Sequence, residues 1–146
     1  TAWSIGVVRR ALDEGIAYIK EREAFGHPIG KFEAIQFELA EDYSKLEAAR
    51  WLLYRAAWMF DEAEKGNASW EEAEKAVTAA KLRATVDGYQ ALQHVCRWHG
   101  AYGYTTDADV FRAYRGFWTY IIGEGTPEVM KLILGRHLLG REFRPF

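Results

Sequence analysis

The chain has 146 residues, of which 49% are hydrophobic and 27% charged, and its formal net charge is -2. This length and composition predict a domain with a buried core. The balanced charge argues against a nucleic-acid-binding protein, and no apolar run is long enough to span a membrane. The one cysteine, Cys96, permits no internal disulfide and fits a reducing compartment. We therefore expect the cytoplasm, or the mitochondrial matrix in a eukaryote.

Helical periodicity begins at the first residue. Residues 1–24 and 31–65 carry apolar side chains at steps of three and four, and Gly26, Pro28 and Gly30 interrupt the pattern between them. The first face contains Ile5, Val8, Leu12, Ile16 and Ile19, and the second contains Ile35, Leu39, Tyr43, Leu46, Ala49, Leu53, Ala57 and Phe60. Two long helices are therefore expected.

A third long helix is predicted from Ser69 to about His99. Ser69 and Glu72 form a capping-box pattern, which marks a helix start. The apolar face of this helix contains Ala73, Val77, Ala80, Ala84 and Leu92. A loop rich in glycine and aromatic residues follows at 100–109, and a short helix is expected at about 108–119.

The last predicted helix begins after Thr126 and ends near Leu139. Thr126 suits the N-cap, Pro127 the first helical position, and Gly140 the position after the end. No strand or linker is predicted. The sequence thus predicts an all-α fold, an antiparallel up-and-down helical bundle, as a single domain over 1–146. Since Thr1 already lies in a helical pattern, we expect an excerpt of a larger protein.

Glu124 is the first candidate functional residue. It lies between Gly123 and Gly125, just before the last helix. A carboxylate at a helix start is often only a loop residue stabilised by the helix dipole. It also suits a general base, because flanking glycines let the backbone approach a ligand without a Cβ in the way.

Two further segments are candidates for ligand contact. Arg22 ends the first helix in "EREAFGHPIG" (21–30), where it is either a surface arginine or a phosphate ligand. The loop in "RWHGAYGYT" (97–105) is either a packed turn or a place where backbone amides meet a ligand. It is neither a dinucleotide fingerprint nor a P-loop.

Other reactive or aromatic residues have simpler interpretations. The histidines have no metal-ligand spacing, so no metal site is predicted. Cys96 is expected to be a core thiol. Four aromatic residues are expected in the core or at an interface, namely Trp51, Tyr54, Trp58 and Phe60.

Four segments, in order and with matching gaps, resemble the C-terminal domain of the acyl-CoA dehydrogenase family. They are "ALDEGIAYIKEREAFGHPIGKFEAIQFELAE" (11–41), "LEAARWLLYRAAW" (46–58), "HGAYGYT" (99–105) and "IGEGTPEV" (122–129). The resemblance covers nearly the whole chain, and its specificity comes from four motifs in one register.

The resemblance implies an oxidoreductase of fatty acid metabolism. In that family, this helical bundle follows an N-terminal helical domain and a middle β domain, neither of which is in the sequence. The proteins are usually homotetramers, built as dimers of dimers, with FAD at a subunit interface. A glutamate takes the α proton of an acyl-CoA thioester while the β hydrogen leaves as hydride to the flavin. The electrons then pass to an electron-transferring flavoprotein.

The resemblance also implies roles for individual residues. The base falls on Glu124, whose backbone amide also helps to stabilise the developing enolate. Gly125 falls against the thioester, and Thr126 and Glu128 fall near the flavin's adenosine side. The residues expected to reach the FAD of a neighbouring subunit are Arg22, Phe25, Gly100 and Ala101, and Arg97 is expected to donate to a pyrophosphate.

The sequence departs from the family pattern at four positions. Glu33 and Arg97 stand where the family has glutamine, Gly116 replaces an aspartate, and Gly123 replaces an aromatic residue before the base. Gly123 suggests a roomier site that accepts a bulky, branched or cyclic acyl group. The departures leave two alternatives to the dehydrogenase: an acyl-CoA oxidase on the same scaffold, or a non-catalytic subunit of a heteromeric dehydrogenase.

Overall fold

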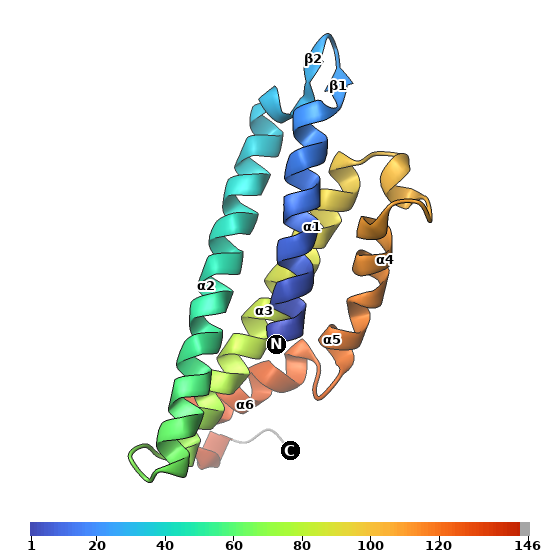
Figure 1. Cartoon of the computed structure of the whole chain (residues 1–146). Helices are drawn as coiled ribbons and strands as arrows, with labels where there is room; N and C mark the ends of the chain where they lie inside the picture. Colours follow the sequence, from blue (N-terminus) through green and yellow to red (C-terminus); the bar gives the residue numbers. More distant parts are fainter. Residues whose placement is uncertain (144–146) are drawn as a thin grey trace.

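Helix α3 (Trp70–Trp98) is the central element, because the other long helices and α6 pack against it (Figure 1). The computed structural model describes residues 1–143. The other helices are α1 (Ala2–Glu21), α2 (Glu33–Glu64), α4 (Asp109–Gly116), α5 (Trp118–Ile122) and α6 (Pro127–Leu139), with 3-10 turns η1 (Ile29–Lys31), η2 (Tyr102–Tyr104) and η3 (Arg141–Phe143). Helices α1, α2, α3 and α4 alternate in direction, and α6 closes the lower end (Figure 1). The predicted all-α, up-and-down bundle is confirmed.

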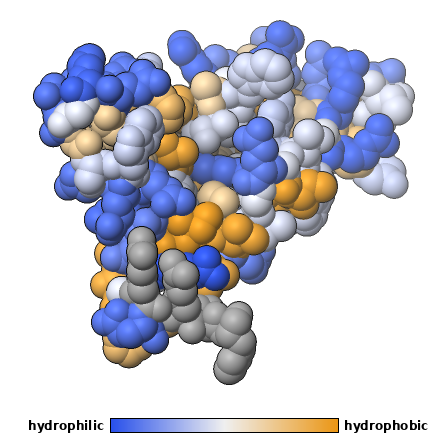
Figure 2. All heavy atoms as spheres, turned by 90° about the horizontal axis from the view of Figure 1, so that it is seen from below, coloured by the Kyte–Doolittle hydropathy of each residue, from blue (hydrophilic) through white to orange (hydrophobic). Residues whose placement is uncertain are grey.

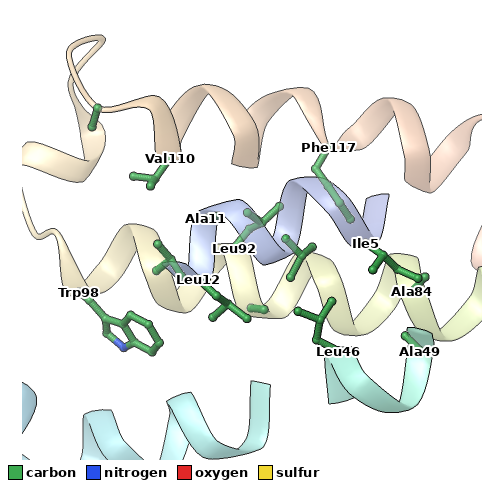
Figure 3. Packing of buried hydrophobic residues seen from close by; sticks show 14 of the residues in the cluster. Ile5, Ala11, Leu12, Leu46, Ala49, Ala84, Leu92, Trp98, Val110 and Phe117 are labelled. Atoms are coloured by element: carbon green, nitrogen blue, oxygen red, sulfur yellow. The ribbon is translucent and has the colours of Figure 1, made fainter. Parts of the chain in front are cut away.

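The main hydrophobic core fills the space between α1, α2, α3 and α4 (Figure 3). Leu92 and Phe117 are both 0% exposed in it. Gly88 permits this packing, since an added Cβ would lie 2.8 Å from Val8 and 2.9 Å from the Phe117 ring. The buried residues of α1 that periodicity predicted are Ile5, Val8, Leu12 and Ile19.

A second, smaller core joins the lower halves of α2 and α3. Its buried members are Ala56, Met59, Ala63, Ala73, Ala76 and Ala80. Small side chains on both helices let the backbones approach closely. This part of the bundle is therefore built from close helix contact rather than from large side chains.

The predicted face of α2 is wrong by one residue in this lower half. Ala56 and Met59 are buried, whereas Ala57 and Phe60 are exposed. The large aromatics Trp51, Tyr54 and Trp58 are also exposed, so the expectation that these aromatics form core is wrong. The alanines of α3 explain this result, because a seam of small residues leaves no room for an indole or phenol ring. The interface alternative for these aromatics stays a prediction.

Two short strands, β1 (Glu23–Ala24) and β2 (His27–Pro28), form an antiparallel hairpin that the sequence analysis did not predict. Phe25 and Gly26 form its two-residue turn, with φ of 56° and 84°. Two positive φ angles match the twist of such a hairpin, which is why the first helix ends at Glu21 and not at residue 24.

The helix ends follow the predicted signals in most places. Ser69 Oγ accepts from the Glu72 amide at 3.2 Å, and Thr126 is the N-cap residue of α6, with Pro127 in its first turn. The short helix predicted at about 108–119 is instead two helices, α4 and α5, which meet at Phe117. Gly116, a poor helix former, ends α4 there. None of the helices in residues 1–143 is long and apolar enough to cross a membrane.

Candidate active site

The candidate residues lie in two groups at opposite ends of the bundle (Figure 1). The glutamate loop (residues 123–126) joins α5 to α6 at the lower end. The arginine end consists of Arg22, Phe25, Arg97, Gly100 and Ala101, where α1 and α3 finish. The two groups are held apart by α3, along which the rise from Lys81 to Arg97 is about 24 Å.

The glutamate loop has an uncommon backbone conformation. Glu124 has φ of 56°, and within residues 1–143 only Phe25 shares a positive φ among residues other than glycine. Gly125 follows at φ 108°, which glycine adopts without strain. Residues in this left-handed region are energetically costly and concentrate at functional sites. Both such residues are ones that the sequence analysis had selected.

Gly123 lies tightly against the end of α5. Its N–H donates to Thr119 O at 2.9 Å, and an added Cβ would lie only 2.6 Å from that same oxygen. This close contact explains why a glycine stands before the base, while the expectation of a roomier acyl site stays a prediction. The glycine is required by this contact on one side and lines a cavity on another.

Lys81 of α3 holds the glutamate loop from the other side. Its Nζ donates to Gly123 O and, at 2.7 Å, to Gly125 O. Burial lowers the pKa of Lys81, and the negative charge of Glu124 opposes that change. One ammonium group thus links the middle of α3 to the carbonyl groups on both sides of the glutamate.

A cavity of about 560 Å³ lies beside this loop. Its lining includes Lys81, Glu124, Thr78, Thr85, Tyr120 and Met130. The Glu124 side chain is exposed. Seen from below, apolar surface lies among charged side chains at this end (Figure 2). A carboxylate beside a cavity, next to apolar surface, has the setting of a general base.

The start of α6 provides the other candidates of the lower end. Thr126 is half-buried and Glu128 is exposed in the first turn. The backbone amide at Glu128 lowers the pKa of its carboxyl group, as expected at the positive end of a helix. Glu128 therefore carries a stable negative charge close to the glutamate loop.

At the upper end, the hairpin presents two exposed side chains. Arg22 is exposed at the C-cap of α1, directly before the hairpin, and Phe25 is 92% exposed at the tip of the turn. The Phe25 ring meets Phe32 edge-on, with ring centroids 6.1 Å apart. Tyr18 stacks on His99 at 4.1 Å and so joins the ends of α1 and α3. The structure thus brings the hairpin and the glycine loop to the same end.

Arg97 is exposed but already has a partner. Its guanidinium donates to Glu38 of α2, and the same carboxylate accepts from Trp98 Nε1 at 2.9 Å. Burial acts to raise the pKa of Glu38, but the hydrogen bonds from Trp98 and Arg97 outweigh it and the pKa is lowered. A guanidinium has five N–H donors, so Arg97 can still bind a second anion.

The glycine loop after α3 is tightly packed at one position and open at another. Gly100 has φ of 58°, and an added Cβ there would meet no atom within 4 Å. At Gly103 an added Cβ would lie 2.4 Å from Cys96 O. Ala101 is exposed beside them. The backbone of this loop is therefore accessible at residues 100–101, whereas Gly103 packs the loop against the end of α3.

Two more polar pairs continue below Arg97 and Glu38 along the contact between α2 and α3. His94 Nδ1 lies 2.8 Å from Asp42 Oδ2, and Lys45 donates to Gln90 at 3.2 Å. The Asp42 side chain is 0% exposed, and its Oδ1 has no hydrogen-bond partner. Burial raises the pKa of Asp42, although His94 opposes this. The region that the sequence analysis read as apolar therefore contains a buried carboxyl group.

Sequence reasoning missed Lys81 and Glu38. A signal for Lys81 was present, because Thr78, Lys81 and Thr85 are spaced by three and four residues and so share one side of α3. Both threonines are buried, and all three residues line the cavity. A lysine in line with buried threonines indicates a polar contact inside the fold. In residues 1–143 no group of three potential metal ligands exists.

Comparison with known proteins gives a consistent result. Residues 1–139 match the family model described as "Acyl-CoA dehydrogenase, C-terminal domain". The chain is 38% identical over 138 residues to 3-(aryl)acrylate reductase of Clostridium sporogenes, covering 94% of this chain and 35% of that protein. It is 40% identical over 136 residues to the caffeyl-CoA reductase-Etf complex subunit CarC of Acetobacterium woodii, covering 93% and 34%.

Solved structures agree with the sequence relatives. Butyryl-CoA dehydrogenase from Megasphaera elsdenii is 32% identical, with a TM-score of 0.81 over 93% of this chain and 34% of that one. The chain thus spans about a third of the length of the relatives that it matches.

Proposed function

The chain belongs to the acyl-CoA dehydrogenase family, and we propose that it is the C-terminal helical domain of a FAD-dependent enzyme that oxidises an acyl-CoA thioester between its α and β carbons. The N-terminal helical domain and middle β domain of such an enzyme would lie outside residues 1–146. The observation that carries the proposal is the glutamate loop, in which a strained, exposed Glu124 faces a cavity and is held by Lys81.

Glu124 is the base that takes the α proton in this proposal. The flanking glycine at 125 lets the thioester lie close to the backbone, since it presents no side chain. Docking of the other domains and of the acyl chain against this end excludes water, which strengthens the electrostatic interactions inside the site. The Glu124 backbone N–H then donates to the thioester oxygen as negative charge develops there.

The exposed groups of the arginine end fit FAD. Two guanidinium groups suit a pyrophosphate, the exposed Phe25 ring suits contact with a planar group, and residues 100–101 offer accessible backbone. We therefore assign Arg22, Phe25, Arg97, Gly100 and Ala101 to one flavin, and Thr126 and Glu128 to the adenosine side of another. The flavin supplies the hydride acceptor for the β hydrogen.

The distance between the two ends supports an assembly of several copies. Along α3 they lie about 24 Å apart, so one copy cannot place both groups around one reacting carbon. We propose a homo-oligomer, arranged as a dimer of dimers, in which each arginine end serves a neighbour's flavin. The name of the Acetobacterium relative, which includes an Etf complex, supports an electron-transferring flavoprotein as electron acceptor.

Reduction of an activated double bond is a second candidate, because two of the relatives described above are named reductases. The same groups serve both directions, since Glu124 that accepts the α proton in oxidation returns it in reduction. The direction is decided by comparing the rates at which one enzyme preparation oxidises saturated thioesters and reduces α,β-unsaturated thioesters.

Glu124→Gln in the natural enzyme tests the proposal. The variant should retain FAD and bind the thioester, but flavin bleaching by an acyl-CoA should fall by several orders of magnitude, because an amide cannot take the proton. Normal bleaching would refute the assignment of the base. Oxygen consumption during turnover would identify an oxidase, and absence of flavin from the purified native protein would identify a non-catalytic subunit.

A further inference from the structure

Lys81 of α3 contacts the glutamate loop on both sides of the base. Its ammonium group binds Gly123 O and Gly125 O, the carbonyl oxygens of the residues immediately before and after Glu124. These carbonyls come from the connection between α5 and α6, whereas Lys81 comes from the middle of α3. One side chain therefore fixes the peptide units on both sides of the glutamate to the central helix.

We propose that Lys81 is the positioning residue of the base. It holds Glu124 in its left-handed conformation and turns the Glu124 backbone N–H away from α3, free to bind the thioester oxygen. This inference rests on the proposed function, because it assigns Lys81 a task in that same reaction.

The direction of the amide follows from peptide geometry. In a planar trans peptide the C=O and N–H bonds point in opposite directions. Since Gly123 O points at Lys81, the N–H of Glu124 in that same peptide unit must point away from Lys81. In the part of the chain that the structure describes, this N–H donates to no backbone carbonyl, unlike the Gly123 N–H, which is bound to Thr119. The amide is therefore an available donor.

The strain at Glu124 requires such a restraint. A residue other than glycine persists in the left-handed region only where its surroundings over-determine it. Lys81 supplies two charge-assisted hydrogen bonds, which are stronger than neutral ones. Partial burial of the ammonium strengthens these bonds further, because less water competes for the carbonyl oxygens. Thr85, one turn along α3, donates to Lys81 O at 2.9 Å and so satisfies its own hydroxyl without competing for the loop.

The alternative is that Lys81 merely ties α6 to α3 and contributes only to stability. The two roles differ in what they change. A positioning residue alters the rate of proton removal from bound thioester, while a purely structural tie alters the amount of folded protein. Deuterium incorporation at the α carbon in heavy water reports proton removal directly and needs no hydride transfer.

Lys81→Met in the natural enzyme is the main test, with Lys81→Arg as the conservative variant. Lys75→Met is the matched control, because Lys75 lies on the same helix and, among residues 1–143, makes only a surface ion pair of 3.7 Å with Glu71. We expect Lys81→Met to lower the saturating rate of α-hydrogen exchange by about 100-fold, as for a misplaced catalytic group, with little change in thioester affinity. Lys81→Arg should restore part of the rate, because a guanidinium also donates to two carbonyls.

The outcomes separate this inference from the proposed function. Loss of exchange in Glu124→Gln with a normal rate in Lys81→Met would overturn the role of Lys81 alone. Normal exchange in Glu124→Gln would overturn the proposed function itself. The positioning role would also be overturned if the exchange rate of Lys81→Met fell only in proportion to its loss of folded protein and Lys81→Arg did not restore it. If Lys81→Met fails to fold, Lys81→Gln gives the same test, since its amide is neutral and shorter than lysine and so makes no charge-assisted hydrogen bonds to the two carbonyls.

Discussion

The two ends of the bundle present their candidate residues in opposite ways. At the lower end, the Glu124 backbone is fixed within the chain by Lys81, by the contact of Gly123 with α5 and by the start of α6. At the upper end, Arg22 and Phe25 extend into solvent from a hairpin. A base must be held within a fraction of an ångström. In the proposed role of Glu124 as the base, this support is built into the same domain. In the proposed assembly, the groups that would bind a neighbour's flavin must remain exposed until that subunit arrives.

Among substitutions that test the difference between the two ends, Gly123→Ala is expected to have the largest effect on stability and rate. The new Cβ would lie 2.6 Å from Thr119 O, a backbone atom that cannot move alone, so the glutamate loop must shift. We expect a loss of about 1–3 kcal/mol in the free energy of unfolding, as for other overpacked sites. A displaced base should also lower the rate of flavin reduction by about 100-fold. Urea unfolding and stopped-flow absorbance measure the two effects.

Gly116→Ala is the control for this change, because an added Cβ there meets no atom within 4 Å and the residue has no positive φ. It should leave the rate unchanged and stabilise the chain by up to about 1 kcal/mol, since alanine favours a helix. Equal rates in the two variants would show that the glutamate loop is not held as tightly as the structure indicates.

Arg22→Met tests the opposite character of the upper end. Arg22 is exposed, so its loss should change the free energy of unfolding by less than about 0.5 kcal/mol. The dissociation constant for FAD should rise about 10-fold or more, because a hydrogen bond to a charged group is lost. Fluorescence titration of the flavin-free enzyme measures this constant, with Arg10→Met, on the helix that precedes Arg22, as control. The same FAD affinity in both variants would contradict the assignment of Arg22.

The fold was predictable where small local signals agreed. The serine cap of α3, the proline at the start of α6 and the periodicity of α1 placed these helices to within a few residues. The hairpin was not predictable from periodicity, since each strand has only two residues. Its turn needs positive φ at Phe25, and phenylalanine gives no sign of this in a sequence.

The candidate site was predictable only in part. Flanking glycines identified the unusual backbone at Glu124, and the structure shows the positive φ that such a position allows. Lys81 was missed because a lysine in a helix is usually read as a solvated residue, although its spacing from Thr78 and Thr85 placed it on a buried side. The lower half of α2 was misread because large aromatic residues were given more weight than alanines, and close helix packing favours the alanines.

The smallest expected effect concerns the buried pair of Asp42 and His94, which supports the upper end from inside. Burial raises the pKa of Asp42 above its ordinary 3.8, so the folded chain holds this proton more tightly than the unfolded chain. The contribution of Asp42 to stability is therefore greatest below pH 3.8 and declines as the pH rises through the folded value. Asp42→Asn removes the titrating group while it retains an oxygen that can accept from His94.

As the pH rises above 3.8, the wild type should therefore lose stability relative to Asp42→Asn, whose amide does not titrate. Urea unfolding of both proteins at a series of pH values measures this difference. Carboxyl groups with lowered pKa, such as Glu38, act in the opposite direction but are present in both proteins and cancel. A difference that stays constant with pH would mean that Asp42 titrates as in the unfolded chain. In that case water would reach Asp42 in the interior of the upper end. The upper end would then be solvent-accessible inside as well as at its surface, and the two ends would differ more than the structure indicates.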